Sequence, residues 1–260
     1  MVKSLIETAP NRIDLWQVDL AADQAGLCES VLSADESLRA EKFAFSKDRD
    51  TFVRSRAALR LILSRYLNCQ AGELEFQYNE HGKPRLQFPS IGGPGFNLSH
   101  SGEEAVIAIA RGRNVGVDMS ILPGTGDQNL EWLAVAKRSF SPAEQTLLFA
   151  LPAASQERMF YLIWSQKEAY TKGIGEGYRY GFQRFTVAVD ARGGTGLIAD
   201  EKNPRHVGEW QLTRIDTGRD SIAVLAYDGP QGPRIRKLEL RLNSSAESIV
   251  EISANSEWTD

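Results

Sequence analysis

The most informative stretch of this chain reads Trp164-Ser165-Gln166-Lys167-Glu168-Ala169-Tyr170-Thr171-Lys172-Gly173. If the stretch is helical, Glu168 and Lys172 lie four residues apart and are neighbours on one face. The helix then aims a carboxylate and an ammonium in the same direction. A Glu–Lys pair at this spacing is by itself usually a solvated decoration of a helix. It therefore indicates chemistry only where further acidic groups converge on it.

A second acidic group lies upstream in Val115-Gly116-Val117-Asp118-Met119, which is predicted to be a short strand. Asp118 is either a turn residue at a strand end or a buried acid, and a buried carboxylate without a partner is costly. A metal ion that bridges Asp118 and Glu168 would supply the partner. Gly116 shares the strand face of Asp118 and would let a ligand approach the backbone closely. Two carboxylates and a lysine can hold a hard divalent cation against a phosphate, which suggests phosphate chemistry.

The overall composition is that of an ordinary globular protein. Its 260 residues, 42% hydrophobic and 25% charged, suffice for one large domain or two small ones. The net charge of -4 gives no general attraction to nucleic acid, so no such partner is expected and any anion site must be a local cluster. Cys28 and Cys69 cannot form a disulfide framework, which favours the reducing cytoplasm. No apolar run approaches the length of a membrane span, and no signal-peptide pattern opens the chain.

Hydrophobic periodicity predicts a mixed α+β fold. Helices are predicted over 48–67 and over 130–173, the latter broken near Ser141-Pro142 and Pro152. Further helix starts are marked by the spacing of Ser33 with Glu36 and of Ser141 with Glu144. Strands are predicted near 13–20, 74–78, 96–98, 105–110, 115–119, 185–189, 210–215 and 222–227. Each half runs helix then strands, which indicates two similar lobes that meet near residue 113, although no sequence repeat supports a duplication.

The chain becomes polar beyond Gly229. In this part Leu238, Leu240 and Leu242 alternate with polar residues and would add an edge strand. The final residues are expected to be mobile.

The helix predicted over 48–67 carries arginines beside its apolar stripe. Arg49, Arg56 and Arg60, with Arg39 upstream, are either surface solubilisers or the cations that a multiply charged phosphate ligand needs. Further along the chain, the predicted turn His81-Gly82-Lys83-Pro84 presents another cation. Alone it is most often a solvated hairpin, so Lys83 matters only if the basic helix is close to it.

A polar segment, Asn97-Leu98-Ser99-His100-Ser101-Gly102, joins two predicted strands. It is either a tight turn whose hydroxyls cap backbone groups or a phosphate cradle of hydroxyls, amides and an imidazole. A Ser–His nucleophile pair is disfavoured because adjacent strand residues point to opposite faces. No spacing is typical of a zinc site, a Walker loop or a dinucleotide fingerprint. The glycines of Gly173-Ile174-Gly175-Glu176-Gly177 predict a helix stop and a loop.

These motifs, in this order, resemble the 4'-phosphopantetheinyl transferases of the surfactin-synthetase type. The resemblance rests chiefly on G-V-D at 116–118 and W-S-x-K-E-A-x-x-K at 164–172. The N-L-S-H segment at 97–100, the H-G-K-P turn at 81–84 and the basic segment from Ser33 to Arg60 fall in family order. The resemblance as a whole covers roughly residues 12–228.

The resemblance implies an α+β fold of two pseudo-symmetric lobes with the active site in the cleft between them. An N-terminal lobe, 1–112, would hold the adenine and 3'-phosphate of coenzyme A, and a C-terminal lobe, 113–228, would carry the metal and the catalytic residues. Residues 229–260 would form a polar, partly mobile extension. The implied enzyme is a holo-[acyl-carrier-protein] synthase that moves phosphopantetheine from coenzyme A to a serine of an apo acyl or peptidyl carrier protein. A monomer is favoured, because a chain with both metal acids in one lobe and the basic helix in the other could work alone, and the cysteine usage favours the cytoplasm.

Particular residues follow from the same resemblance. Asp118 and Glu168 would hold Mg²⁺ or Mn²⁺, Glu168 would act as base for the serine proton, and Lys172 would contact the reacting phosphate or the leaving group. The residues implied for coenzyme A are Arg39, Arg56, Gly82, Lys83, Pro84, Ser99 and His100. Ser120 stands where many bacterial relatives carry another acid, so water and the diphosphate would complete the metal shell.

Two matters stay open at this stage. The alternative function is a non-catalytic module that binds coenzyme A or docks a carrier protein, although such a module would not need both acids. The carrier protein is expected to dock near the loop 123–130, and neither the carrier nor its pathway follows from the sequence.

Overall fold

The structure is a computed structural model, and it describes residues 6, 9, 11–21, 25–88, 93–122, 131–188, 194–217, 220–229 and 232–240. The chain divides into two compact units. The first contains Met1–Gly112 and the chain from Gly232 onward, and the second contains Arg113–Gln231. Among the helices in the described part of the chain, none has the length and apolarity needed to cross a membrane.

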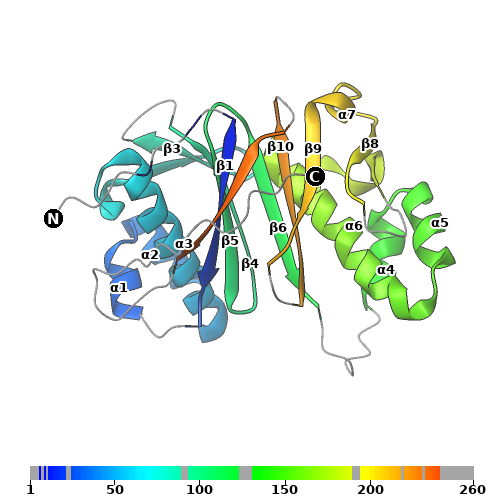
Figure 1. Cartoon of the computed structure of the whole chain (residues 1–260). Helices are drawn as coiled ribbons and strands as arrows, with labels where there is room; N and C mark the ends of the chain where they lie inside the picture. The colour runs from blue at the N-terminus through cyan, green and yellow to red at the C-terminus, as the bar shows by residue number, and fades with distance from the viewer. Residues whose placement is uncertain are drawn as a thin grey trace. The chain divides into compact units, whose positions relative to one another are not determined.

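The first unit packs a long helix on a four-stranded sheet (Figure 1). The sheet has the order β11-β1-β5-β4, in which β5 is antiparallel to both neighbours and β11 is parallel to β1. Its strands are β1 (Arg12–Asp19), β4 (Gly95–Ser101), β5 (Glu104–Ala110) and β11 (Arg234–Leu240). The helix, α3 (Ser46–Leu67), buries apolar side chains such as Leu59 and Ile62 in one core with Trp16 and Ile107.

Smaller elements surround this core. They are α1 (Ala25–Ser30), α2 (Ala34–Ala40), the 3-10 turn η1 (Ala71–Glu73) and the antiparallel hairpin of β2 (Glu75–Tyr78) and β3 (Pro84–Phe88). The predicted start of α2 is confirmed, since the backbone N–H of Ser33 donates to Glu36 Oε2 at 3.2 Å.

The second unit places another long helix, α6 (Ala153–Ile174), against a three-stranded antiparallel sheet (Figure 1). The sheet has the order β6-β10-β9 and is formed by β6 (Val115–Ile121), β9 (Trp210–Ile215) and β10 (Ser221–Asp228). The remaining elements are α4 (Glu131–Ser139), α5 (Pro142–Ala150), η2 (Gly177–Tyr180), η3 (Phe182–Arg184), β7 (Phe185–Val187), β8 (Leu197–Asp200) and α7 (His206–Glu209).

Local signals explain where the helices of the second unit begin and end. Ser141 caps α5, because Glu144 N donates to Ser141 Oγ at 3.4 Å and Ser141 N donates to Glu144 Oε2 at 2.8 Å. Pro152 directly precedes α6. Gly175, with a φ of 85°, ends α6 in the left-handed conformation that favours glycine. The predicted helical breaks and the predicted helix stop are therefore confirmed.

The mixed α+β class is confirmed, and each unit contains a helix of 22 residues, a larger sheet and a two-stranded hairpin. The structure differs from the prediction that residues 229–260 form a separate extension. β11 pairs in parallel with β1, so residues 234–240 belong to the first unit. This pairing joins strands from opposite ends of the chain, and local pattern does not reveal it. Leu238 and Leu240 are buried as their alternation predicted, whereas Leu242 and the tail lie outside the described residues.

Candidate active site

Gly116 sets the distance between β6 and α6. A Cβ atom placed on Gly116 would lie 2.0 Å from the carbonyl oxygen of Ala169 and 2.3 Å from the amide nitrogen of Gly173. No side chain fits there, so the backbones of strand and helix touch. The prediction that Gly116 admits a ligand is wrong, because α6 occupies that space.

Asp118 lies two residues further along the same face of β6. Its side chain is 8% exposed, and Oδ1 accepts a hydrogen bond from Lys172 Nζ at 2.6 Å. Lys172 comes from the last turn of α6 and keeps 27% of its side chain exposed. Asp118 of the strand and Lys172 of the helix are thus in direct contact. Their hydrogen bond joins two opposite charges, and such charge-assisted bonds are stronger than neutral ones.

Glu168 lies one helical turn before Lys172. Burial raises its pKa, the Lys172 ammonium opposes that rise, and the negative charge of Asp118 adds to it. Asp118 and Glu168 are therefore electrostatic neighbours in the seam between β6 and α6. A carboxylate whose pKa is raised in this way is suited to accept a proton. The three residues predicted to be catalytic belong to one site in the second unit.

Two hydroxyl groups also lie between β6 and α6, in the region of Asp118, Glu168 and Lys172 that is called the seam here. Ser120 Oγ, two residues beyond Asp118, lies 3.4 Å from Ser165 Oγ of α6. Within the residues that the structure describes, no group of three or more His, Cys, Asp or Glu side chains is placed to hold a metal ion. The seam offers two carboxylates and two hydroxyls, which are the hard oxygen ligands that Mg²⁺ accepts when water fills the other positions.

Arg60 of α3 is a structural residue. Its Nε donates to Glu36 Oε2 at 2.6 Å, and its Nη1 donates to the carbonyl oxygens of Ala71 at 2.9 Å and Leu74 at 3.0 Å. Its side chain is 1% exposed. The hypothesis that Arg60 belongs to a ligand-binding stripe is wrong, because a buried Glu36 needs buried cations.

Arg56 shares that role in part. Its Nε donates to Glu36 Oε1 at 2.9 Å, and its Nη2 donates to the hydroxyl of Tyr78 at 2.6 Å. It thereby links α3 to the end of β2, where the turn with Lys83 begins. Its use in coenzyme A binding stays a prediction.

The other two arginines differ in position. Burial raises the pKa of Tyr78 and the charges of Arg56 and Arg39 both oppose that rise, so Arg39 lies near Arg56, whereas Arg49 lies at the surface. Arg39 packs its guanidinium over the ring of Phe52, 5.1 Å from the centroid. Arg49 forms surface ion pairs with Glu29 and Asp50. The four arginines do not form one stripe.

The turn that carries Lys83 is well defined. Asn79 Oδ1 accepts hydrogen bonds from the backbone N–H groups of His81 at 3.0 Å and Lys83 at 2.8 Å. Gly82 has a φ of 85°, and Pro84 begins β3. The bond between Tyr78 and Arg56 brings this hairpin to the arginine side of α3. The condition that the turn should lie near the basic helix is met through this bond, while the role of Gly82, Lys83 and Pro84 stays a prediction.

The segment with Ser99 and His100 is strand, not turn. β4 extends to Ser101, with Ser99 paired opposite Val106 and His100 opposite Ala105. Ser99 is buried and His100 is exposed, so the two side chains lie on opposite faces of the sheet. The expectation of a turn over 97–102 is wrong because cross-strand pairing continues to the last residues before Gly102. A contribution of both residues to coenzyme A binding stays a prediction.

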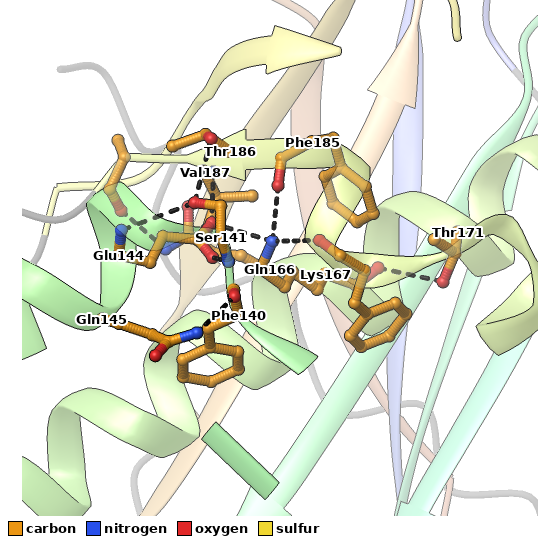
Figure 2. Close-up of polar contacts among 12 residues, drawn as sticks. Phe140, Ser141, Glu144, Gln145, Gln166, Lys167, Thr171, Phe185, Thr186 and Val187 are labelled. Atoms are coloured by element: carbon orange, nitrogen blue, oxygen red, sulfur yellow. Dashed lines mark hydrogen bonds and ion pairs between the residues drawn. The ribbon is translucent and has the colours of Figure 1, made fainter. Parts of the chain in front are cut away.

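Lys167 was not among the predicted site residues, although it precedes Glu168 directly. Its side chain is fully buried, and Nζ lies 2.8 Å from Glu144 Oε1. Figure 2 shows Lys167 pointing toward Glu144 and toward Phe185. Burial lowers the pKa of Lys167 to about 8, and the charge of Glu144 opposes that change. The capping box of α5 was the sequence signal for Glu144, but nothing in the sequence linked it to Lys167.

Both halves of the chain match known families. Residues 114–225 match the family described as the 4'-phosphopantetheinyl transferase superfamily, and residues 20–111 match the one described as 4'-phosphopantetheinyl transferase, N-terminal. The first match includes Asp118, Glu168 and Lys172.

Curated relatives carry the same description. The 4'-phosphopantetheinyl transferase HetI of Nostoc sp. is 38% identical over 171 residues, which cover 64% of this chain and 70% of the relative. A phosphopantetheinyl transferase of Thraustochytrium sp. is 33% identical over 242 residues, or 87% of this chain and 84% of the relative. The 4'-phosphopantetheinyl transferase Sfp of Bacillus subtilis is 26% identical over 199 residues, or 76% and 84%.

Solved structures give shorter overlaps. A holo-(acyl-carrier-protein) synthase from Bacillus anthracis, in complex with CoA (3',5'-ADP), covers 44% of this chain and 94% of its own, with 18% identity and a TM-score of 0.35. The fold of the chain is α+β, and its sequence matches place it among the phosphopantetheinyl transferases. It belongs to the 4'-phosphopantetheinyl transferase superfamily.

Proposed function

We propose that this protein is an enzyme that transfers the 4'-phosphopantetheine moiety of coenzyme A to a serine of an apo acyl or peptidyl carrier protein. The observation that carries the proposal is the meeting of Asp118, Glu168 and Lys172 in the seam between β6 and α6. Membership of the superfamily supports it, since the related proteins are named for this activity.

The reaction needs a proton acceptor and a means to offset negative charge. The serine hydroxyl attacks the pantetheine-side phosphorus of coenzyme A, and the bond from that phosphorus to the bridging oxygen breaks. The electron pair leaves with adenosine 3',5'-bisphosphate. Glu168, whose pKa is raised by burial, takes the serine proton. Lys172 places an ammonium beside the phosphates and offsets the charge that gathers on the leaving group.

The donor set of the seam fits Mg²⁺, which Asp118 and Glu168 would hold. When bound, the ion supplies a positive charge that neutralises the diphosphate and orients it. Mn²⁺ accepts the same oxygen ligands. Burial is the main cause of the raised pKa of Glu168, and the negative charge of Asp118 adds to it; a bound cation would offset both effects.

Coenzyme A would be held by the cations and the turn of the first unit. We assign the 3'-phosphate to Lys83 and Arg39, with Gly82 and Pro84 shaping the turn and Arg56 holding the hairpin through Tyr78. Ser99 and His100 are assigned to the other phosphates.

Mass spectrometry of an apo carrier protein tests the function directly. The carrier is incubated with the protein, coenzyme A and Mg²⁺, and its intact mass is measured. A gain of one phosphopantetheine, absent with Asp118→Ala, is the expected result. Binding of coenzyme A without that gain would instead support the alternative, a non-catalytic binding or docking module.

Location and oligomeric state are also proposals. Cys28 and Cys69 are free thiols, in keeping with a reducing cytoplasm. A monomer is proposed because the three catalytic residues come from one chain, and light scattering after gel filtration would test it. The loop 123–130, expected to dock the carrier, lies outside the described residues.

A further inference from the structure

A buried ion pair lies behind the catalytic helix. Lys167 and Glu144 are both fully buried, and their charged atoms are 2.8 Å apart. Removing two charges from water is costly, and an apolar pair of similar volume is often as stable. Stability alone is therefore a weak explanation for a lysine and a glutamate at these two positions.

Every polar group of the pair has partners. Lys167 Nζ donates to the carbonyl oxygens of Phe182 at 2.8 Å and Phe185 at 2.7 Å, besides its contact with Glu144. Glu144 Oε1 also accepts the backbone N–H of Val187 at 2.7 Å, and Oε2 accepts that of Ser141 at 2.8 Å. Figure 2 shows these groups from α5, α6 and β7 turned toward one another. A fully satisfied buried network of this kind fixes a single arrangement.

The residue before Lys167 adds to the same attachment. Gln166 is fully buried, its Nε2 donates to the carbonyl oxygen of Ala188 at 2.9 Å, and its Oε1 accepts the N–H of Gly196 at 3.0 Å. Two consecutive side chains thus tie α6 to the hairpin of β7 and β8 by directional bonds.

The opposite side of α6 is fixed by the close backbone contact at Gly116. Between the two attachments lies Glu168, one residue after Lys167 and therefore about 100° further around the helix. The contact at Gly116 sets how near the helix lies to β6, and the bonds of Lys167 set its rotation. A rotation of α6 would move Glu168 and Lys172 together away from Asp118.

We propose that the Lys167–Glu144 pair is a positioning device, which holds α6 at the rotation that brings Glu168 and Lys172 to Asp118. The proposal rests on the proposed transferase function for its kinetic test only. Lys167 is fully buried and touches no solvent, so it acts through the position of its neighbours. The charges that shift the pKa of Glu168 are those of Lys172 and Asp118.

The test is the double variant Lys167→Met/Glu144→Leu, which removes both charges and leaves neither one alone. We expect it to fold with a lower melting temperature, because the backbone groups of Ser141, Phe182, Phe185 and Val187 lose buried partners, so kcat is measured well below that temperature. We expect kcat to fall by about 10- to 100-fold, because small displacements of reacting groups have effects of this size. The KM for coenzyme A and the acid limb of the pH–rate profile should not change. Lys202→Met, at a surface ion pair with Glu176, is the matched control.

A crystal structure of the double variant gives a readout that does not depend on activity. The distance between Lys172 Nζ and Asp118 Oδ1 should exceed hydrogen-bond length, compared with 2.6 Å here. An unchanged distance together with wild-type kcat overturns the proposal. If the wild type fails to modify any carrier, the proposed function is overturned, and the structure of the variant still decides on the positioning role. Should the double variant not fold, Glu144→Gln replaces it, and wild-type kcat in that variant overturns the proposal.

Discussion

At the scale of single residues, Glu168 shows how function and stability conflict in this site. Glu168 is half-buried and lies near the charge of Asp118, and both burial and that charge raise the pKa of its carboxyl group. The ionised form needed to accept a proton is thus the less stable one in the folded protein. Sites that hold charges in this way are commonly stabilised when the charge is removed, while activity is lost.

Replacing Glu168 by Gln tests this conflict. We expect transfer to fall by about 10²- to 10⁴-fold, as for the loss of a general base. Between its ordinary pKa and its raised pKa, Glu168 binds more protons in the folded than in the unfolded state, so its contribution to stability decreases as pH rises through that window. Without metal, the variant should therefore melt at a higher temperature than the wild type at pH 8 and show less difference at pH 4. Equal melting temperatures at both pH values would contradict the electrostatic account.

Gly116 gives a second prediction at this scale. In Gly116→Ala, the new methyl group meets the backbone of Ala169 and Gly173, and α6 must move away from β6. We expect a loss of stability of about 1–3 kcal/mol, typical of overpacking. The rate of carrier modification should fall by more than the loss of folded protein explains. The reason is that the contact of Lys172 with Asp118 depends on the same close approach of α6 to β6. Urea denaturation and carrier modification measure the two effects. Gly72→Ala, where a Cβ meets nothing within 4 Å, is the control.

At the scale of elements, local patterns predicted helices and strands well. The apolar period of 48–67 and the break at Pro152 gave α3 and α6, because such signals act within a few residues. Spacing and family motifs also predicted that Asp118, Glu168 and Lys172 would act together, but not that Asp118 and Lys172 would be in direct contact. The sequence could not show which charged side chains are buried or which strands distant in sequence pair with each other. From the sequence, Arg60 was interpreted as a surface or ligand-binding cation, yet its side chain is buried and donates a hydrogen bond to Glu36.

Arg60 supplies the prediction at this scale. In Arg60→Met, Glu36 and the carbonyl oxygens of Ala71 and Leu74 lose a buried donor. We expect a loss of about 3–5 kcal/mol, as when one partner of a buried pair is removed. Arg49→Met, at an exposed ion pair on the same helix, should leave stability nearly unchanged. Denaturant titration of both variants makes the comparison, and similar losses in the two would contradict the buried role of Arg60.

At the scale of the whole molecule, the two ends of the described chain meet in one unit. β1 and β11 pair over seven positions, from Arg12 with Arg234 to Val18 with Leu240. Across this pairing, Asp14 accepts two hydrogen bonds from Arg236, at 2.9 and 2.8 Å, and one from Tyr66 of α3 at 2.7 Å. The buried carboxylate thus fastens the last described strand to the first strand and to the long helix. The second unit, which contains the candidate active site, lies between them in the sequence.

This connection predicts that the two units respond differently to a change in β11. In Arg236→Met, the carboxylate of Asp14 loses its two-point partner, which should lower the stability of the first unit by about 1–3 kcal/mol. Hydrogen exchange followed by mass spectrometry would then show faster exchange in β1, β5 and β11, while β6 and α6 keep their protection. Equal acceleration throughout would mean that the units unfold as one. Preserved protection in the second unit would mean that α6, which carries the proposed catalytic residues, keeps its arrangement when the sheet of the first unit is weakened.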